Sequence, residues 1–381
     1  MNSYSFPLDV NALLSVLNHL NQGVYVTDRE RRIVLWNRKA EEITGYRAAD
    51  IVGKACHQQV LCHTDKDGHP LCSTGLCPLF RAIRLGKESR HPVLVYARRA
   101  DGSRVAVSVS VGPIRNQAGE VVGGIETFRD VTESISDLEF ARKIQQYLLP
   151  PAPEPTGRLR FDVRYYPLDL VGGDFYDIRP LGEDRFGILV ADVSGHGVSA
   201  ALYTMWLKSL EETLSADAAE PDRFLSGINR ELSRFVLAES FATAFYGVVS
   251  AGSDGCSLRY SNAGHPTPLH FHAARGEVTE LEIHGMPLGI IGAQGYPAAT
   301  ASLEPGDLLL CYTDGVTEVI DRNGDMIGPE GLAARLTRGL AGPESHLLER
   351  LYTEIKEACG DVSLPDDVLL LSVRHQPGSR V

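Results

Sequence analysis

Residues 189–197 decide the fold of the C-terminal part of the chain and read Leu-Val-Ala-Asp-Val-Ser-Gly-His-Gly. The apolar residues before Asp192 are typical of a buried strand that ends on a carboxylate. The glycines on either side of His196 indicate a tight turn. From Ser199 to Leu237 the apolar spacing changes to a helical period, so we expect a strand, a turn and helices in this order.

Three further apolar segments carry aspartates at their ends. Asp174 follows two glycines, Asp314 closes an apolar run, and Asp366 and Asp367 open another. A single Asp beside Gly is most often a turn or capping residue. Four such sites can instead converge on one cleft, where like charges repel unless a cation neutralises them. Donors that are all oxygen favour Mg²⁺ or Mn²⁺.

Further motifs accompany these aspartates in a fixed order. They are GGDFYD (172–177), DVSGHG (192–197), SAAL (199–202), FATAF (241–245), SNAGHP (261–266), YTDGVTE (312–318) and the pair DD (366–367). In this order, over about residues 140–376, the chain resembles the PPM class of metal-dependent protein phosphatases in its bacterial SpoIIE-type branch, also called RsbU-like. The resemblance implies an α-β-β-α sandwich for residues 156–376 and a protein serine/threonine phosphatase activity.

The resemblance also implies roles for individual residues. Asp192 would bridge two Mn²⁺ or Mg²⁺ ions, with the Asp174 carboxylate and the backbone carbonyl of Val193 at one of them. Asp314 and Asp366 would hold the other ion. Two such ions activate a water for direct attack on a phosphoryl group, so no covalent phosphoenzyme is needed.

Three neighbouring positions receive other assignments. His196 is expected either to orient or protonate a reacting group, or to serve as a structural turn residue. Asp367, which strand alternation predicts to be exposed, is expected to support or cap the site rather than to bind metal. Leu369 stands where many family members carry threonine, at a position that is not a ligand.

The N-terminal part predicts a second α+β domain. Strand-like runs cover residues 23–27, 33–36, 93–98, 105–111 and 121–128, with helical segments between the second and third. The motifs NRKAEE (37–42), TGY (44–46) and RDVTE (129–133) accompany this order. Together they resemble a PAS sensor domain over residues 9–133, with a five-stranded antiparallel sheet and helices.

Residues 134–155 are expected to join the two domains. Apolar residues recur every three to four positions between 131 and 149, as in an amphipathic helix, and four prolines between 150 and 155 stop it. The helix is interpreted either as packed on its neighbour or as a signalling linker, and we expect that the PAS domain and this helix allow a homodimer to form.

Four of the seven cysteines lie between residues 56 and 77, together with three histidines. The cysteines Cys56, Cys62, Cys72 and Cys77 are candidate ligands of zinc or an iron–sulfur cluster, or parts of a thiol redox switch, with His57, His63 and His69 as substitutes. Their spacing matches no common zinc motif, so packed thiols are the alternative. Cys256, Cys311 and Cys359 are expected to be inert buried thiols.

The 381 residues carry a formal charge of −12, with +3 in residues 1–135 and −15 in the rest. This balance argues against nucleic-acid binding through bulk charge. No signal peptide or uninterrupted apolar run of about 20 residues is present, so we expect a cytoplasmic protein without membrane contact.

The motifs together predict that a PAS domain regulates a phosphatase. The resemblance implies that the substrate is a phosphorylated STAS-type anti-sigma-factor antagonist in a partner-switching pathway. Two other functions stay open: a non-catalytic scaffold that binds partners, and a metal-dependent hydrolase of small phosphate esters. A sensor histidine kinase is excluded because no ATP-binding boxes follow the linker.

Overall fold

The structure is a computed structural model. It describes residues 9–66, 68–89, 91–155, 158–195, 197–234, 240–252, 255–342, 346–360 and 364–376. The chain divides into two compact units, Met1–Asp137 and Leu138–Val381, and each is described by itself.

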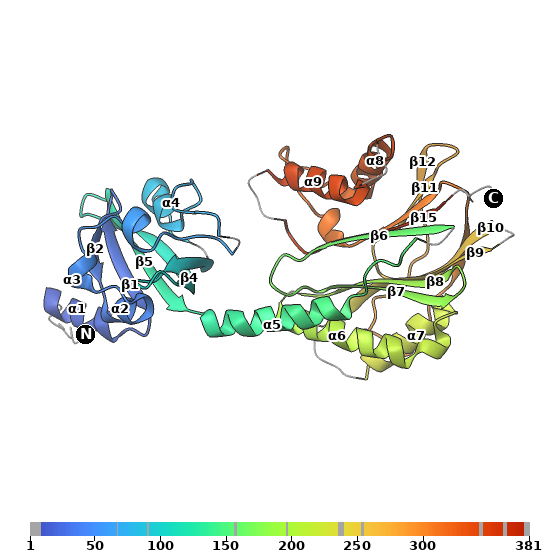
Figure 1. Ribbon diagram of the computed structural model, residues 1–381, viewed down its shortest axis with the longest axis horizontal. Coiled ribbons are helices and arrows are strands. Elements are labelled where there is room, and N and C mark those ends of the chain that lie inside the picture. Colours follow the sequence, from blue (N-terminus) through green and yellow to red (C-terminus); the bar gives the residue numbers. More distant parts are fainter. Residues whose placement is uncertain are drawn as a thin grey trace, which may run out of the picture. The chain divides into compact units, whose positions relative to one another are not determined.

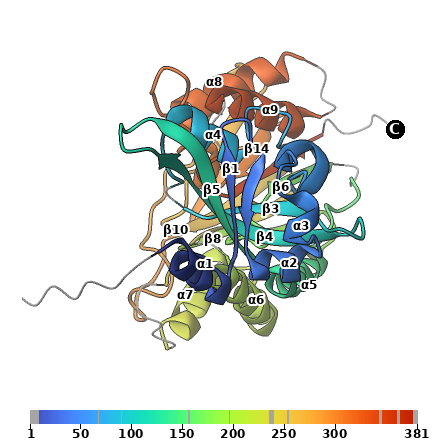
Figure 2. The ribbon, with the colours of Figure 1, turned by 90° about the vertical axis from the view of Figure 1, so that its left-hand side faces the viewer.

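The first unit is built on one antiparallel sheet with the strand order β2-β1-β5-β4-β3 (Figures 1 and 2). Its strands are β1 (Gly23–Asp28), β2 (Ile33–Trp36), β3 (Val93–Arg98), β4 (Arg104–Arg115) and β5 (Val121–Asp130). Its helices are α1 (Val10–His19), α2 (Arg38–Thr44), α3 (Ala48–Ile51), a π-helix (Cys56–Val60) and α4 (Pro78–Leu85). This arrangement confirms the predicted PAS fold.

Alternation along β4 explains how this sheet forms its core. Val105, Val107 and Val109 are at most 1% exposed and pack with Val95 of β3. Asn37 connects the sheet to α2, because its side-chain oxygen accepts hydrogen bonds from the backbone N–H of Val24 (2.8 Å) and Ala40 (2.9 Å). One asparagine therefore caps a helix and fixes it against a strand.

The second unit contains two antiparallel five-stranded sheets. The first sheet has the order β13-β10-β9-β8-β7 and comprises β7 (Asp174–Gly182), β8 (Arg185–Val193), β9 (Ala242–Gly252), β10 (Gly255–Ala263) and β13 (Ala299–Leu303). The second has the order β12-β11-β14-β15-β6 and comprises β6 (Leu159–Tyr166), β11 (Leu269–His272), β12 (Glu277–Glu280), β14 (Leu308–Tyr312) and β15 (Val368–His375).

Helices cover the outer faces of the two sheets (Figure 1). Helices α6 (Val198–Thr213) and α7 (Pro221–Leu232) lie on the first sheet, and α8 (Gly328–Leu340) and α9 (Leu347–Cys359) lie on the second. A third cluster of buried side chains fills the space between the sheets. The α-β-β-α sandwich is therefore confirmed.

Strand β15 shows why the sequence forms these layers. Its side chains alternate between two faces, and both faces are covered. Leu369 and Leu371 point into the core between the sheets, whereas Leu370 packs with the helices α8 and α9. An unbroken apolar run is what a strand buried on both faces requires.

Several elements of the second unit went unpredicted. The short strands β11 and β12 are rich in polar residues, and α8 and α9 follow loops with no distinctive motif. The predicted stripe of α7 is confirmed for Phe224, Ile228 and Leu232, which are at most 1% exposed. Phe235, the fourth residue predicted for this stripe, lies outside the described residues. The three isolated thiols Cys256, Cys311 and Cys359 are buried, as expected.

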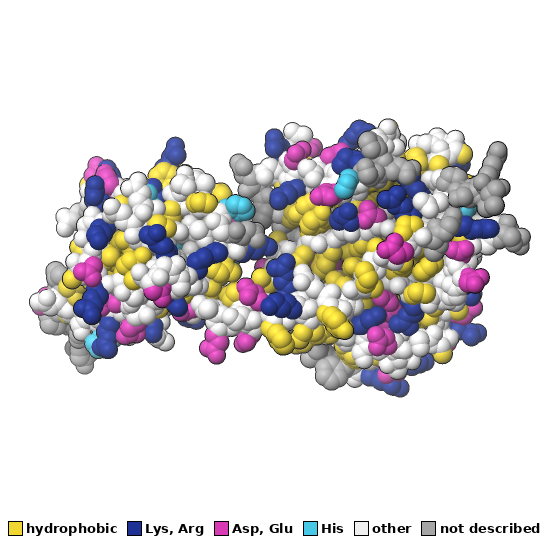
Figure 3. All heavy atoms as spheres, in the orientation of Figure 1, with side chains coloured by type: hydrophobic (Ala, Val, Ile, Leu, Met, Phe, Trp, Pro, Cys, Tyr) yellow, Lys and Arg dark blue, Asp and Glu magenta, His cyan; other side chains and the backbone are white. Residues whose placement is uncertain are grey.

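The predicted linker helix is α5 (Thr132–Leu148). Its part in the second unit buries Gln145 but exposes Phe140 (66%), Ile144 (39%) and Tyr147 (89%) at helical spacing. On the face of α5 shown in Figure 3, hydrophobic side chains lie next to acidic and basic ones. None of the helices in the described residues is both long and apolar enough to cross a membrane.

Candidate active site

Two of the predicted aspartates lie directly beside each other on the first sheet. Asp174 opens β7 and Asp192 lies near the end of β8, and the two are register partners across this antiparallel pair. Asp192 also pairs with Thr243 of β9. The hairpin β7–β8 therefore presents both carboxylates at the same end of the sandwich.

The second sheet brings Asp314 and Asp366 to this end. Asp314 begins a 3₁₀ turn just after β14, and Asp366 precedes β15, which is hydrogen-bonded to β14. Gly315 lets the two segments touch, because a Cβ at this position would overlap the carbonyl oxygen of Asp367. Backbone contact of this kind requires glycine.

The aspartates of the two sheets act on one another as like charges. Burial raises the pKa of Asp192 to about 7, and the charges of Asp314, Asp366, Asp367 and Glu318 add to the shift. Burial and the charges of Glu318 and Asp366 raise the pKa of Asp314 to about 6. Within the described residues, no three of these carboxylates bring their oxygens within 4.8 Å of one another.

Asp174 is the most deeply buried of the predicted ligands, at 2% exposed. Burial, together with the charges of Asp192 and Asp367, holds its pKa well above the usual range. A buried carboxylate among other carboxylates is stable as an anion only beside a cation. The all-oxygen donor set therefore fits Mg²⁺ or Mn²⁺.

Asp367 is buried, at 5% exposed, so the expectation of exposure was wrong. Its carboxylate accepts hydrogen bonds from the backbone N–H of Leu168 (2.6 Å), Gly173 (2.7 Å) and Asp174 (3.5 Å). These donors come from the loop before β7 and account for its burial. Asp367 holds the loop that carries Asp174, whereas Asp366 is partly exposed.

Thr313 is a buried residue of the site that the sequence interpretation missed. Its hydroxyl donates a hydrogen bond to Asp174 Oδ2 (2.7 Å) and accepts one from the backbone N–H of Leu369 (3.0 Å). Its place directly before Asp314 in the YTDG motif was the available signal. Thr313 thus links the Asp174 carboxylate on the first sheet to the backbone of β15 in the second.

The backbone of Val193 lies beside the Asp174 loop. Its N–H donates to Gly173 O (3.1 Å), and its carbonyl oxygen would lie 2.8 Å from a Cβ at Gly173. The Val193 carbonyl oxygen therefore lies close to the loop that carries Asp174, the other residue that the resemblance assigns to this ion. His196 lies outside the described residues.

Comparison with known proteins identifies the family of the chain. The family model described as Stage II sporulation protein E (SpoIIE) matches residues 182–376, which is just over half of the chain. The chain belongs to the SpoIIE family. A PAS domain model matches residues 21–133. The second unit is thus a PP2C-type protein serine/threonine phosphatase domain, preceded by a PAS domain.

Individual relatives support this placement of the SpoIIE domain. The chain is 27% identical to phosphoserine phosphatase RsbU of Bacillus subtilis over 252 residues, covering 66% of this chain and 74% of RsbU. It is 30% identical to phosphoserine phosphatase RsbP of Bacillus subtilis over 186 residues, covering 48% of this chain and 45% of RsbP. The SiaA-PP2C domain of Pseudomonas aeruginosa superimposes with a TM-score of 0.54 and 26% identity, covering 64% of this chain and 97% of that domain.

Gln145 connects α5 to the SpoIIE domain. Its side-chain amide donates to Gly172 O (2.8 Å) and to Thr204 Oγ1 of α6 (3.1 Å), and its oxygen accepts from Gly172 N–H (3.2 Å). Gly172 belongs to the loop that Asp367 holds. A shift of α5 along its axis would therefore break hydrogen bonds next to Asp174.

The cysteine-rich segment forms a second group of reactive side chains, in the first unit. Cys77 caps the N-terminus of α4, and a hydrogen bond from the Cys72 thiol, helped by the Phe80 N–H and the charge of Arg31, lowers its pKa to about 6. The sulfur of Cys72 also accepts from the backbone N–H of His63 (3.1 Å). Helix N-termini and arginine stabilise thiolates in this way.

The other two cysteines of this segment differ from that pair. Burial raises the pKa of Cys56 to about 12, with a smaller effect of the Glu126 charge. Cys62 is partly exposed and has a left-handed backbone conformation, with a φ of 44°. Among the four cysteines of this segment, the described interactions therefore link Cys72 and Cys77 to each other.

Proposed function

We propose that the SpoIIE domain removes phosphate from phosphoserine or phosphothreonine on a regulatory protein, in a reaction that requires Mn²⁺ or Mg²⁺. The observation that carries the proposal is the group of like charges formed by the buried Asp174 and the partly exposed Asp192, Asp314 and Asp366. Such a group is held together by cations and is suited to phosphoryl transfer. The similarity to the phosphoserine phosphatases RsbU and RsbP supports phosphoserine as the substrate.

The aspartates and the Val193 carbonyl would together form two neighbouring ion sites. Asp192 would contact both ions, Asp174 and the Val193 carbonyl would complete one site, and Asp314 and Asp366 the other. When bound, the ions supply Lewis-acid activation of water and of the phosphoryl group. Asp367 and Thr313 position Asp174, because they hold its loop and its carboxylate.

The proposed substrate class is a phosphorylated STAS-type anti-sigma-factor antagonist in a partner-switching pathway. RsbU and RsbP, to which the chain is similar, are phosphoserine phosphatases, and the resemblance of the motifs to the SpoIIE-type branch implies a regulatory phosphoprotein as the substrate. A comparison of one such phosphoprotein with p-nitrophenyl phosphate and nucleotides tests this choice. Faster turnover of the small esters would favour a general hydrolase, and no turnover of any substrate would favour a scaffold.

For the PAS domain, we propose that Cys72 and Cys77 act as a dithiol switch. The Cys77 thiolate attacks an oxygen of hydrogen peroxide and becomes a sulfenic acid, and the departing hydroxide takes up the proton that the thiol had released and becomes water. The Cys72 thiol then displaces a second water to form a disulfide, so two thiols and one peroxide give one disulfide and two waters. The neighbouring Arg31 stabilises the attacking thiolate.

Peroxide treatment of the full chain is expected to remove two of its seven free thiols, measured by thiol titration in denaturant. Cys77→Ser should prevent the loss, whereas Cys62→Ser should leave it unchanged. Iron or zinc in anaerobically purified protein would point instead to a cluster or metal site. Equal thiol loss in both variants would rule out the proposed pair.

We also propose a homodimer that forms through α5 and the PAS domain. The exposed Phe140, Ile144 and Tyr147 lie at positions i, i+4 and i+7, which place them on one side of the helix. Burial of such a stripe against a second copy is favourable. A light-scattering mass of one chain at micromolar concentration would contradict this proposal.

A further inference from the structure

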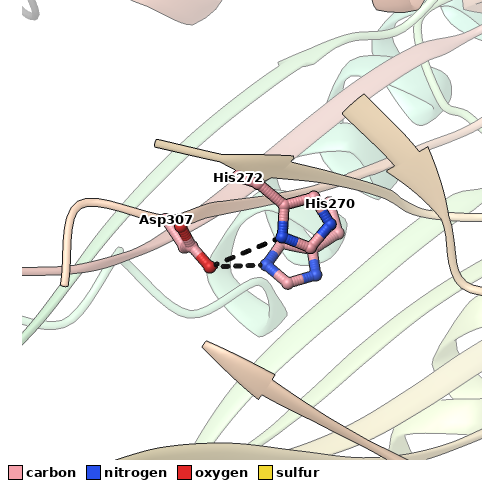
Figure 4. Close-up of side chains that lie close together, drawn as sticks. All are labelled: His270, His272 and Asp307. Carbon is pink, nitrogen blue, oxygen red and sulfur yellow. Dashed lines mark hydrogen bonds and ion pairs between the residues drawn. The ribbon is translucent and has the colours of Figure 1, made fainter. Parts of the chain in front are cut away.

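A second cluster of possible metal ligands lies in the SpoIIE domain, away from the aspartates of the active site. It consists of His270 and His272 of β11 and Asp307, which directly precedes β14 (Figure 4). Strand β14 runs from this cluster toward Asp314, seven residues further on. At about 3.3 Å per residue, the two sites are ~20 Å apart.

The three side chains point at one another. The distance from His270 Nε2 to Asp307 Oδ2 is 2.9 Å, and that from His272 Nδ1 to the same oxygen is 3.9 Å (Figure 4). The histidines are two residues apart on a strand, so both project from the same face. Among the residues that the structure describes, this is the one group of three possible ligands whose donor atoms all lie within 4.8 Å of one another.

We propose that His270, His272 and Asp307 bind one zinc-class divalent ion. Two imidazoles and one carboxylate form a borderline donor set, which suits Zn²⁺ better than the harder Mg²⁺ or Mn²⁺. The site thus differs in chemistry from the all-oxygen group of aspartates. Three protein ligands leave a fourth tetrahedral position for water.

Neighbouring groups hold the ligands in orientations that suit an ion. Thr279 Oγ1 lies 2.9 Å from His272 Nε2, and this contact leaves Nδ1 facing Asp307. Asp307 is fixed by the backbone N–H of Ala273 (2.8 Å) and Glu304 (3.0 Å). Hydrogen-bonded partners of this kind orient metal ligands in known sites.

The spacing of the donor atoms also fits an ion. Ligands about 2.0–2.1 Å from a tetrahedral ion lie ~3.3 Å apart. The observed 2.9 and 3.9 Å bracket this separation, so shifts of about half an ångström would complete the site.

The alternative is a hydrogen-bonded cluster without metal. Asp307 already caps the turn between β13 and β14, and His270 can simply donate to it. The partly exposed His272 separates the two interpretations, because it is too far from Asp307 for a hydrogen bond yet faces it. An ion would connect β11 to the β13–β14 turn and stabilise the outer part of the second sheet.

The test uses the full chain carrying Cys72→Ser and Cys77→Ser, stripped of metal and then saturated with Mg²⁺ to occupy the active site. Zinc is added, excess is removed by gel filtration, and bound zinc is measured by elemental analysis. We expect one zinc per chain, and its loss in His272→Phe, which retains the ring volume. His284→Ala, a change at an exposed histidine in the same unit, should retain the zinc.

Thermal unfolding of the same proteins provides a second readout. At a zinc concentration about a hundredfold above Kd, the midpoint should rise by ~5–10 °C in the background protein and in His284→Ala. His272→Phe and His272→Ala should show no rise. Equal zinc content and equal shifts in the His272 variants and the background would overturn the proposal, as would the absence of bound zinc in the background protein.

Discussion

Asp192→Asn should reduce phosphatase turnover about 10³-fold or more, which corresponds to ~4 kcal/mol of transition-state stabilisation. The reason is its central position: Asp192 pairs with Asp174 across β7–β8, and the charges of Asp314 and Asp366 act on it from the second sheet. Initial rates on a phosphoprotein at saturating Mn²⁺ measure the loss.

The same variant should be more stable than the wild type when metal is absent. Replacing one carboxylate by a neutral amide relieves the repulsion within the cluster. The melting temperature in EDTA should therefore rise, whereas the stabilisation by added Mn²⁺ should shrink. Glu183→Gln, at the exposed turn of the same hairpin, is the matched control and should change neither quantity. Retention of more than a third of the wild-type turnover in Asp192→Asn would show that Asp192 is no bridging ligand.

Asp367→Ala should weaken both the fold and the metal site. Its carboxylate accepts the backbone N–H groups of Leu168 and Gly173, and their loss leaves buried donors unpaired at about 1–3 kcal/mol each. Relief of charge repulsion offsets part of this cost, because Asp367 itself lies close to Asp366. We expect the melting temperature to fall by ~5 °C and the affinity for Mn²⁺ to fall about 10–100-fold.

Asp366→Ala is the informative comparison for this prediction. Asp366 is partly exposed, and its one described hydrogen bond is to the N–H of Asp367. Its replacement should remove activity as strongly as a lost ligand does, with a melting temperature within ~2 °C of the wild type. Thermal unfolding and Mn²⁺ titration of the two variants distinguish a residue that binds the metal from one that holds the loop of Asp174. A large destabilisation in Asp366→Ala with none in Asp367→Ala would contradict this assignment. It would indicate that Asp366 supports the loop and that Asp367 binds the metal.

The placement of the aspartates could be predicted because their signal is local. Asp192 and Asp314 end apolar strands, and Asp366 opens one, so a strand pattern alone positions them at sheet ends. That these ends meet was implied by the family resemblance, and the structure shows the physical reason in the pairing of β14 with β15.

The burial of Asp367 could not be predicted, because it depends on partners far away in the sequence. Alternation along the strand says which face a residue occupies but not what covers it. Here the loop of Gly173, almost 200 residues earlier, supplies the covering N–H groups. Thr313 was missed for the same reason, since its partner Asp174 lies 139 residues away.

The cluster of His270, His272 and Asp307 gave no sequence signal either. Two histidines on a four-residue strand are an unremarkable pattern, and Asp307 lies in an ordinary turn before β14. Only the pairing of β11 with β14 brings them together. In the PAS domain, by contrast, the close spacing of the cysteines is visible in the sequence, but the environment of Cys77 depends on Arg31 from a different element.

Phosphate release from a serine-phosphorylated STAS-type antagonist, followed with and without Mn²⁺, tests the central claim most directly. The account predicts release that follows the Mn²⁺ concentration, stops with EDTA, resumes when Mn²⁺ is restored, and is absent in Asp192→Asn. Release at an undiminished rate in EDTA, or equal release by Asp192→Asn, would contradict it.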